Sequence, residues 1–171
     1  AFVSVTESFS TDNAVGRLTM GLLATFAEFE RATIAQRTSD KMRAARRRGL
    51  WTGGRPVLGF DLPPGGKKLV VNEDEAAMVR TIYDLYLQKK AITAVVDEVD
   101  RRGWVNKIHT TRAGKRMGGG SFTKHAVHFI LTNPLYAGEV RYLGEHFAGE
   151  HEAIVSAATF QRVQDQLAEN A

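Results

Sequence analysis

Residues 16–56 read GRLTMGLLATFAEFERATIAQRTSDKMRAARRRGLWTGGRP, and in this stretch one helical pattern runs from an apolar half into an arginine-rich half. The apolar side chains in and just before the first half are spaced by three or four residues, so they fall on one stripe of a helix. We expect this stripe to face an apolar partner. It consists of Val15, Leu18, Leu22, Phe26 and Phe29.

The second half of the same helix is strongly basic. Its apolar positions thin out to Ile34 and Met42, and its only acid is Asp40. Asp12 or Thr11 can cap the start of the helix, and Gly49 can adopt the left-handed conformation that ends it. We therefore expect a helix of about 35 residues, roughly 50 Å long. Its basic residues are Arg31, Arg37, Lys41, Arg43, Arg46, Arg47 and Arg48.

Charge is sorted along the chain. Residues 31–68 contain ten Lys or Arg against two Asp, and residues 101–124 contain seven Lys or Arg and no acid, yet the net charge is only +4. Two basic segments in an acidic remainder are typical of a polyanion-binding surface, whereas a solubilising surface mixes its charges. The alternative is an amphipathic helix with a merely solvated basic end. The charge distribution favours nucleic acid as the partner.

Composition sets the outer limits. The chain has 171 residues, of which 43% are hydrophobic and 25% charged, so it can bury one moderate core or two small ones. It has no cysteine, and its histidines lack a third ligand nearby, so we expect no metal. Its glycine strings lack the context of nucleotide-binding loops, so we expect no cofactor. Without an apolar run of roughly 18 residues we expect no membrane partner, and a cytoplasmic, nucleoid-associated protein.

The chain divides into three parts by pattern. Residues 1–49 end with the long helix, residues 50–66 are a glycine- and proline-rich linker with apolar docking points, and residues 67–171 form a second unit. In that unit we expect a strand within 67–71, a helix starting at Asn72, a second helix at 92–102, strands within 137–155 and a closing helix at 157–167. The expected fold is mostly α with a small β component (α+β).

Between these elements lie a basic loop and a third short helix. Residues 104–120 are glycine-rich and lack apolar periodicity, so we expect no regular element there. Ser121 can cap a helix at 122–131 that turns outward Lys124, His125 and His128. Three short helices of this kind are typical of a helix-turn-helix variant laid in a major groove. The side chains expected to be buried are Phe122, Ala126, Phe129 and Ile130.

Several strings also resemble one family. FAEFERATIAQRTSDKMRAARRRG followed by GGRP is similar to the end of the catalytic domain of serine site-specific recombinases, the resolvases and DNA invertases, and VTESFSTDNAVGRL is similar to the segment before that helix. Downstream, GFD, NEDEAAMVRTIYDLY, GW and FTKHAVHFILTNPLYAGEV resemble the recombinase domain of the large serine recombinases, which include phage integrases and transposases. The resemblance spans nearly the whole chain.

The resemblance implies roles for individual residues. Glu30 and Arg31 match the family's Glu-Arg pair, whose arginine lies near the active-site phosphate, and a guanidinium suits that task through its planar fork and permanent charge. The apolar stripe becomes a subunit interface for a dimer, or a tetramer in the intact enzyme. The partner is double-stranded DNA at an attachment or resolution site. The residues expected to contact it are Arg37, Arg43, Arg46, Arg47, Arg48, Arg55, Arg112, Lys115, Arg116, Lys124, His125 and His128.

The resemblance also limits the expected activity. In this family the nucleophilic serine and its arginine cluster lie near the start of the catalytic domain, and Ser4, Ser8 and Ser10 do not sit in the nucleophile motif. We expect a fragment that binds recombination sites without cutting them, while its parent cuts and rejoins DNA through phosphoserine linkages. The alternative is a helix-turn-helix transcription regulator or architectural protein that dimerises through its long helix. A pure protein-interaction adaptor leaves the basic segments unexplained.

Overall fold

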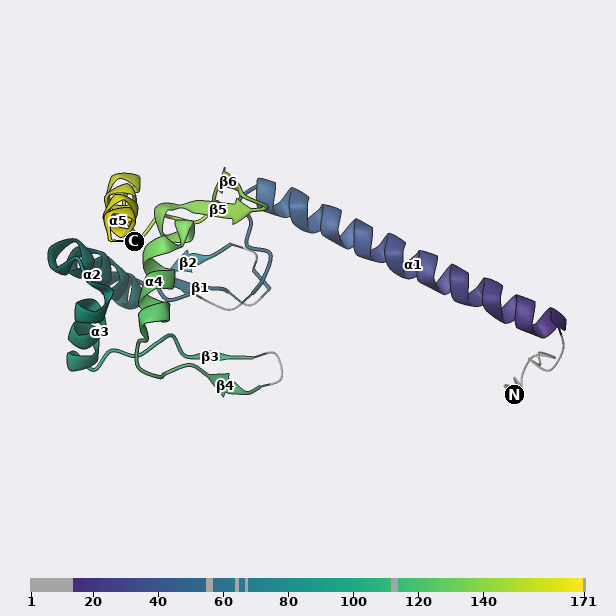
Figure 1. Ribbon diagram of the computed structural model, residues 1–171, viewed down its shortest axis with the longest axis horizontal. Coiled ribbons are helices and arrows are strands. Elements are labelled where there is room, and N and C mark those ends of the chain that lie inside the picture. The colour runs from purple at the N-terminus through teal and green to yellow at the C-terminus, as the bar shows by residue number, and fades with distance from the viewer. Residues whose placement is uncertain (1–13, 55–56, 64, 67, 112–113, 171) are drawn as a thin grey trace. The chain divides into compact units, whose positions relative to one another are not determined.

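The computed structural model describes residues 14–54, 57–63, 65–66, 68–111 and 114–170 (Figure 1). The chain forms two compact units, residues 1–43 and 44–171. Helices dominate, and the strands form small antiparallel pairs, which confirms the expected mostly-α fold with a small β component. The elements are α1 Ala14–Arg47, β1 Phe60–Asp61, β2 Val70–Val71, α2 Glu73–Lys89, α3 Ile92–Arg101, β3 His109–Thr110, β4 Arg116–Met117, α4 Lys124–Thr132, η1 Pro134–Ala137, β5 Glu139–Tyr142, β6 Glu145–Ala148 and α5 Ala157–Glu169.

Helix α1 ends as the sequence predicts. Gly49 has φ +73°, its N–H donates to the Arg46 carbonyl at 2.9 Å, and the Leu50 N–H donates to the Ala45 carbonyl at 3.0 Å. These two bonds form the Schellman motif, which satisfies carbonyls that the last helical turn would leave unpaired. The candidate N-terminal caps, Thr11 and Asp12, lie outside the described residues. None of the described helices is long and apolar enough to cross a bilayer.

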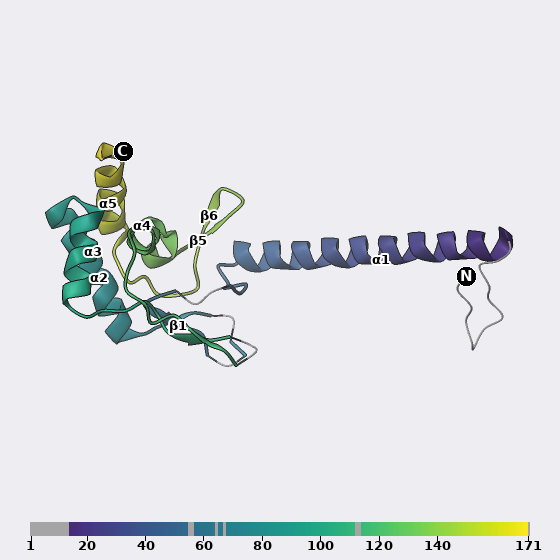
Figure 2. The ribbon, with the colours of Figure 1, turned by 60° about the horizontal axis from the view of Figure 1, so that its bottom comes forward.

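The second unit is built around α2. The Asn72 side chain caps this helix by accepting a hydrogen bond from the Glu75 N–H at 3.2 Å, so the helix starts where the sequence predicts. Helices α3, α4 and α5 pack against α2, and α3 lies beside it in both views (Figures 1 and 2). One stripe of α2 is buried: Ala76, Val79, Ile82, Tyr83 and Tyr86 are each at most 1% exposed.

The chain between α1 and α2 is anchored in the same core. Val57, Leu58 and Phe60 are buried, and Phe60 pairs with Val71 in the β1–β2 ladder. Trp51 packs against the core from the side. The apolar residues of this segment therefore dock on the core, as the sequence predicts.

The structure corrects the expectation for residues 104–120. Instead of a loop, they contain the β3–β4 hairpin, in which His109 pairs with Met117. Backbone bonds continue the ladder, with the Asn106 N–H donating to the Gly120 carbonyl at 2.8 Å. A hairpin of this kind is held by main-chain bonds, so apolar periodicity does not reveal it. Gly118 has φ +91°, and a Cβ there would run into the Lys107 carbonyl oxygen, so this glycine permits the close approach of the two arms.

The structure also corrects the third helix of the second unit, α4. The cap is Thr123, whose hydroxyl accepts from the Ala126 N–H at 3.1 Å, and not Ser121. Phe122 is buried just before the helix, but Phe129 is 49% exposed. The buried side chains are spaced by three and four residues and fill one narrow stripe, and Phe129 lies outside it. That stripe consists of Val127, Ile130 and Leu131.

The remaining elements form as expected. Strands β5 and β6 pair through a two-residue turn in which Leu143 has φ +49° and Gly144 φ +86°, so both central residues are left-handed as in a type I′ hairpin. Ser156 caps α5 by accepting from the Thr159 N–H at 3.1 Å. Val163 of α5 is fully buried against the core.

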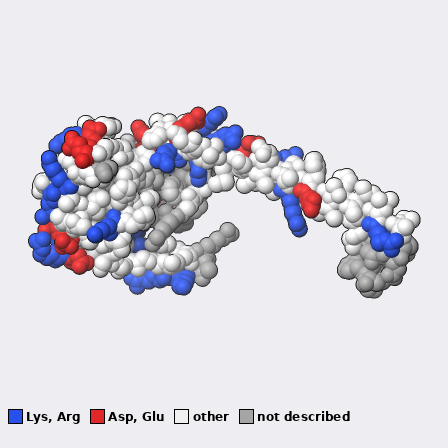
Figure 3. All heavy atoms as spheres, in the orientation of Figure 1, with Lys and Arg blue, Asp and Glu red and all other residues white. Residues whose placement is uncertain are grey.

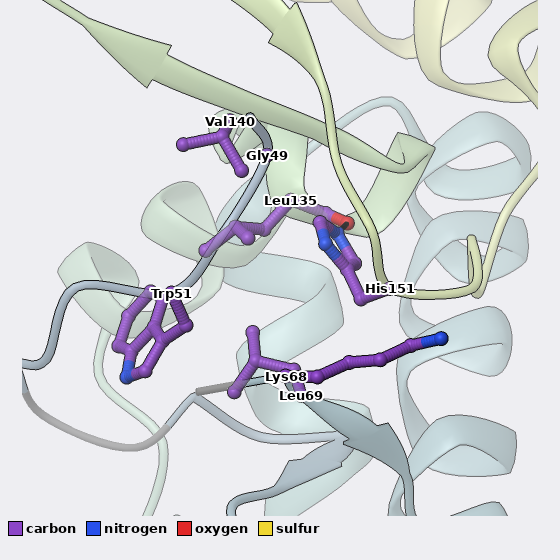
Figure 4. A pocket seen from close by; sticks show the side chains of 7 residues that line it. All are labelled: Gly49, Trp51, Lys68, Leu69, Leu135, Val140 and His151. Carbon is purple, nitrogen blue, oxygen red and sulfur yellow. Dashed lines mark hydrogen bonds between the residues drawn. The ribbon is translucent and has the colours of Figure 1, made fainter. Parts of the chain in front are cut away.

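The end of α1 docks on this β5–β6 hairpin. The Glu150 N–H donates to the Gly49 carbonyl at 3.1 Å, and a Cβ on Gly49 would collide with the Ala148 carbonyl oxygen. Beneath this contact is a small hollow that Trp51 and the buried ring of His151 help to line (Figure 4). His151 Nε2 lies 2.7 Å from the Leu135 carbonyl and donates this bond, because a carbonyl oxygen can only accept. Desolvation by burial lowers the pKa of this histidine.

The docking of Gly49 is testable against a matched helix end. Gly103 closes α3 with the same motif and φ +68°, but nothing lies within 4 Å of its Cβ position. We expect Gly103→Ala to lower the free energy of unfolding by about 1 kcal/mol, which is the strain of a left-handed alanine. Gly49→Ala should lower the free energy of unfolding by about 3 kcal/mol, because the β5–β6 hairpin must also move away from the new Cβ. Urea unfolding of both variants measures the difference, and equal losses would contradict the docking.

Candidate nucleic-acid interface

The last turn of α1 presents arginines of two kinds. Arg47 and Arg48 are exposed, and their side chains have no partner among the described residues. Arg43, one turn earlier, is also exposed, and Arg55 lies outside the described residues. Exposed guanidinium groups with no carboxylate partner are available to phosphate.

Arg46 differs because it is held by its own domain. Its Nε donates to the Thr52 hydroxyl at 2.7 Å, and its guanidinium lies 4.7 Å from the centre of the Tyr142 ring on β5. A hydrogen bond and a cation–π contact together hold the side chain over the hairpin. Arg46 thus ties the helix end to β5, and its contact with DNA stays a prediction.

Helix α4 has one buried and one polar face. Lys124, His125 and His128 are exposed, as the sequence predicts: His125 lies opposite the buried stripe, His128 lies beside it, and Lys124 is the first residue of the helix. The helix contains no acidic residue, so nothing on it repels phosphate. Phe129 lies on the same outer face, which sequence reasoning missed.

The β3–β4 hairpin forms a basic arm. Lys115 and Arg116 are exposed, and Lys and Arg gather along this hairpin in the space-filling view (Figure 3). Near the tip, the Thr111 carbonyl accepts a hydrogen bond from the Gly114 N–H at 2.9 Å, and the Thr111 N–H donates to the Lys115 carbonyl at 2.9 Å. Arg112 lies outside the described residues. A two-stranded ribbon of this size fits a DNA groove.

Some basic residues of the same segment serve the fold instead. The Lys107 ammonium lies 2.7 Å from Asp61 Oδ1 and 2.6 Å from Glu75 Oε2, and its side chain is only 9% exposed. The hydrogen bonds from Lys107 and Asn72 hold the pKa of the Asp61 carboxyl below its ordinary value. Lys107 therefore joins the base of the basic arm to β1 and α2, and is not available to DNA.

The arginines at the end of α3 are likewise paired. Arg101 lies 2.6 Å and Arg102 2.8 Å from the Glu98 carboxylate, whose pKa is lowered chiefly by the hydrogen bond from Arg102. Arg102 also lies over the Trp104 ring. Of the seven basic residues in 101–124, these two and Lys107 are in ion pairs, so the polyanion surface is narrower than the charge count implied.

The first unit is described by α1 alone. Its apolar stripe is exposed, from 57% at Leu22 to 72% at Val15. Glu30, Arg31 and Arg37 are exposed as well, and within the described ranges neither arginine forms an ion pair. An exposed apolar stripe of this length is typical of an interaction surface.

Comparison with known families matches two parts of the chain. Residues 73–170 match the family model described as Recombinase, and residues 1–51 match the model described as Resolvase, N terminal domain. The chain belongs to the large serine recombinases. Its polar-faced α4 and its basic arm lie in the part that matches the first model.

Individual relatives resemble parts of the chain. The Tn917 transposon resolvase of Enterococcus faecalis is 40% identical over 58 residues, covering 34% of this chain and 31% of the relative. The Tn552 DNA-invertase BinR of Staphylococcus aureus is 37% identical over 86 residues, covering 49% and 38%. A putative DNA recombinase of Bacillus subtilis is 28% identical over 130 residues, covering 74% and 24%. The chain thus spans well under half the length of these relatives.

Two solved structures share the fold. One, described as a complex of an LSR with DNA, is 27% identical with a TM-score of 0.63, covering 77% of this chain and 39% of that one. The other, from work on the Listeria innocua prophage attP site, is 28% identical with a TM-score of 0.59, covering 74% and 49%. Both likenesses include most of the described residues.

The two kinds of arginine at the end of α1 predict different stability effects. Arg46→Ala removes the bonds to Thr52 and Tyr142, and we expect it to lower the free energy of unfolding by about 1–2 kcal/mol. Arg47→Ala, at the neighbouring exposed position, should change it by less than about 0.5 kcal/mol. Thermal and urea unfolding of both variants measure this. Equal stability of the two variants would contradict the structural role of Arg46.

Proposed function

We propose that this chain is the DNA-binding part of a large serine recombinase and that it binds double-stranded DNA at a recombination site. The observation that carries the proposal is the outer face of α4, where Lys124, His125 and His128 are exposed on a helix without acids. In the proposed complex this face enters the major groove, where such side chains reach base edges and phosphates.

The proposed contacts continue on both sides of α4. Arg47 and Arg48, at the end of α1, follow the DNA backbone, and Arg55 enters the minor groove, because extended glycine-arginine segments add charge with little bulk. Arg37 and Arg43 extend this path along the helix. The β3–β4 arm, with Arg112, Lys115 and Arg116, supplies further phosphate contacts. In the proposed function, residues 1–49 belong to the catalytic part, residues 67–171 form the DNA-binding domain, and residues 50–66 are the linker between them.

The wider activity is also a proposal. The exposed stripe of α1 supports self-association into the dimer and tetramer that strand exchange requires, and Glu30 and Arg31 sit on that helix near where a reacting phosphate would lie. The intact enzyme would cut and rejoin DNA through phosphoserine linkages. A DNA substrate places the protein in the cytoplasm, at the nucleoid.

The phosphate contacts are testable through salt dependence. Each phosphate contact adds about 0.9 to the slope of log affinity against log salt concentration. We expect Arg47→Ala with Arg48→Ala to lower that slope by about 1.8 on any duplex, while Arg101→Ala, whose partner is Glu98, leaves it unchanged. Fluorescence anisotropy with duplex DNA at several salt concentrations measures the slopes. An unchanged slope in the double variant would remove these arginines from the interface, and no binding by the native chain would overturn the proposed function.

The self-association is testable on the apolar stripe. Leu22→Glu with Phe26→Glu places charge where a partner helix would pack, and we expect dimer affinity to fall by about a hundredfold or more. Ala24→Glu lies on the opposite side of α1 and serves as the control. Sedimentation equilibrium over a range of concentrations measures the association. A native chain that is monomeric throughout, or equal behaviour of the two variants, would contradict the interface.

A further inference from the structure

Phe129 is a large apolar side chain where the proposed function expects polar ones. Its ring is 49% exposed on α4, although the sequence pattern placed it in the core. Successive residues of an α-helix are turned by about 100°, so Phe129 lies above His125, one turn away, and beside His128 on the solvent side of the helix. The ring therefore belongs to the surface that the proposed function turns toward DNA.

The fold does not require a phenylalanine at this position. Val127, Ile130 and Leu131 already fill the contact between α4 and the core, and Phe122 adds a buried ring before the helix begins. An aromatic ring half exposed to water gives up part of the free energy that burial would supply. It has only two rotatable bonds, so it loses little entropy when a partner covers it.

We propose that Phe129 is a specificity-determining residue that packs on the C5 methyl group of a thymine in the major groove. This inference rests on the proposed function, because it requires α4 to lie in that groove. The thymine methyl is the apolar group that base edges display there, and apolar side chains recognise it by contact. Lys124 and the two histidines offer charge and hydrogen bonds to neighbouring groups, so the ring adds an apolar contact to an otherwise polar face.

The experiment begins with a binding site for the full chain. Duplexes that bind are selected from a random-sequence library, and one selected duplex is then remade with each thymine replaced in turn by uracil. Uracil keeps the pairing with adenine and lacks only the methyl group. We expect one replacement to weaken binding by about fourfold, the effect of one buried methyl group.

Variants assign that loss to the ring. Phe129→Ala should bind the thymine duplex more weakly and no longer distinguish it from the uracil duplex, whereas Phe129→Leu should retain part of the discrimination. Leu143→Ala is the control, because Leu143 is 74% exposed on the β5–β6 turn, away from α4. It should discriminate as the native chain does. Circular dichroism melting checks that each variant is folded.

Each other outcome overturns the inference. Failure of every uracil replacement to weaken binding, or persistence of the discrimination in Phe129→Ala, would remove the thymine contact. Equal loss on selected and random duplexes would make the ring a non-specific contact, and a change in sedimentation without a change in sequence preference would make it a protein contact. Failure of the native chain to enrich any duplex is a different result, because it overturns the proposed function itself.

Discussion

The hydrogen bond from the Glu150 N–H to the Gly49 carbonyl, 3.1 Å long, holds the C-terminal end of α1 on the β5–β6 hairpin within the second unit. The left-handed backbone of Gly49 ends the helix, and its missing Cβ lets the β5–β6 hairpin approach. Arg46 reinforces the same contact by reaching the Tyr142 ring. Val57, Leu58 and Phe60 enter the core within about ten residues of Gly49. The backbone between Gly49 and the core is therefore held at both ends, at one end by this docking.

The basic residues divide into two groups. Arg46, Lys107 and Arg102 lie against aromatic rings or carboxylates of their own domain, and their charges hold secondary-structure elements together. Arg47, Arg48, Lys115, Arg116 and Lys124 are exposed and unpaired among the described residues. A count of charges along the sequence cannot separate the groups, because the carboxylates that neutralise Lys107 come from positions 32 and 46 residues away.

The helices were largely predictable because their signals are local. Asn72 before three acids, Ser156 before α5, and glycines after α1 and α3 each act within one turn of the residues they cap. The β3–β4 hairpin was missed because its ladder is made of main-chain bonds between residues with no apolar alternation. The outward side chains of α4 were predicted, since polar residues that follow one another at helical spacing must share a face.

Phe129 shows why that prediction was incomplete. Both Ala126–Phe129–Ile130 and Val127–Ile130–Leu131 have helical spacing, so periodicity alone allows two orientations of α4 that differ by a rotation about its axis. The second set is β-branched at Val127 and Ile130, and it packs against α2 and α3 once those helices are in place. The choice therefore depends on the shape of the core, a tertiary property, and it moves a phenylalanine from the expected core to the surface that the proposed function assigns to DNA.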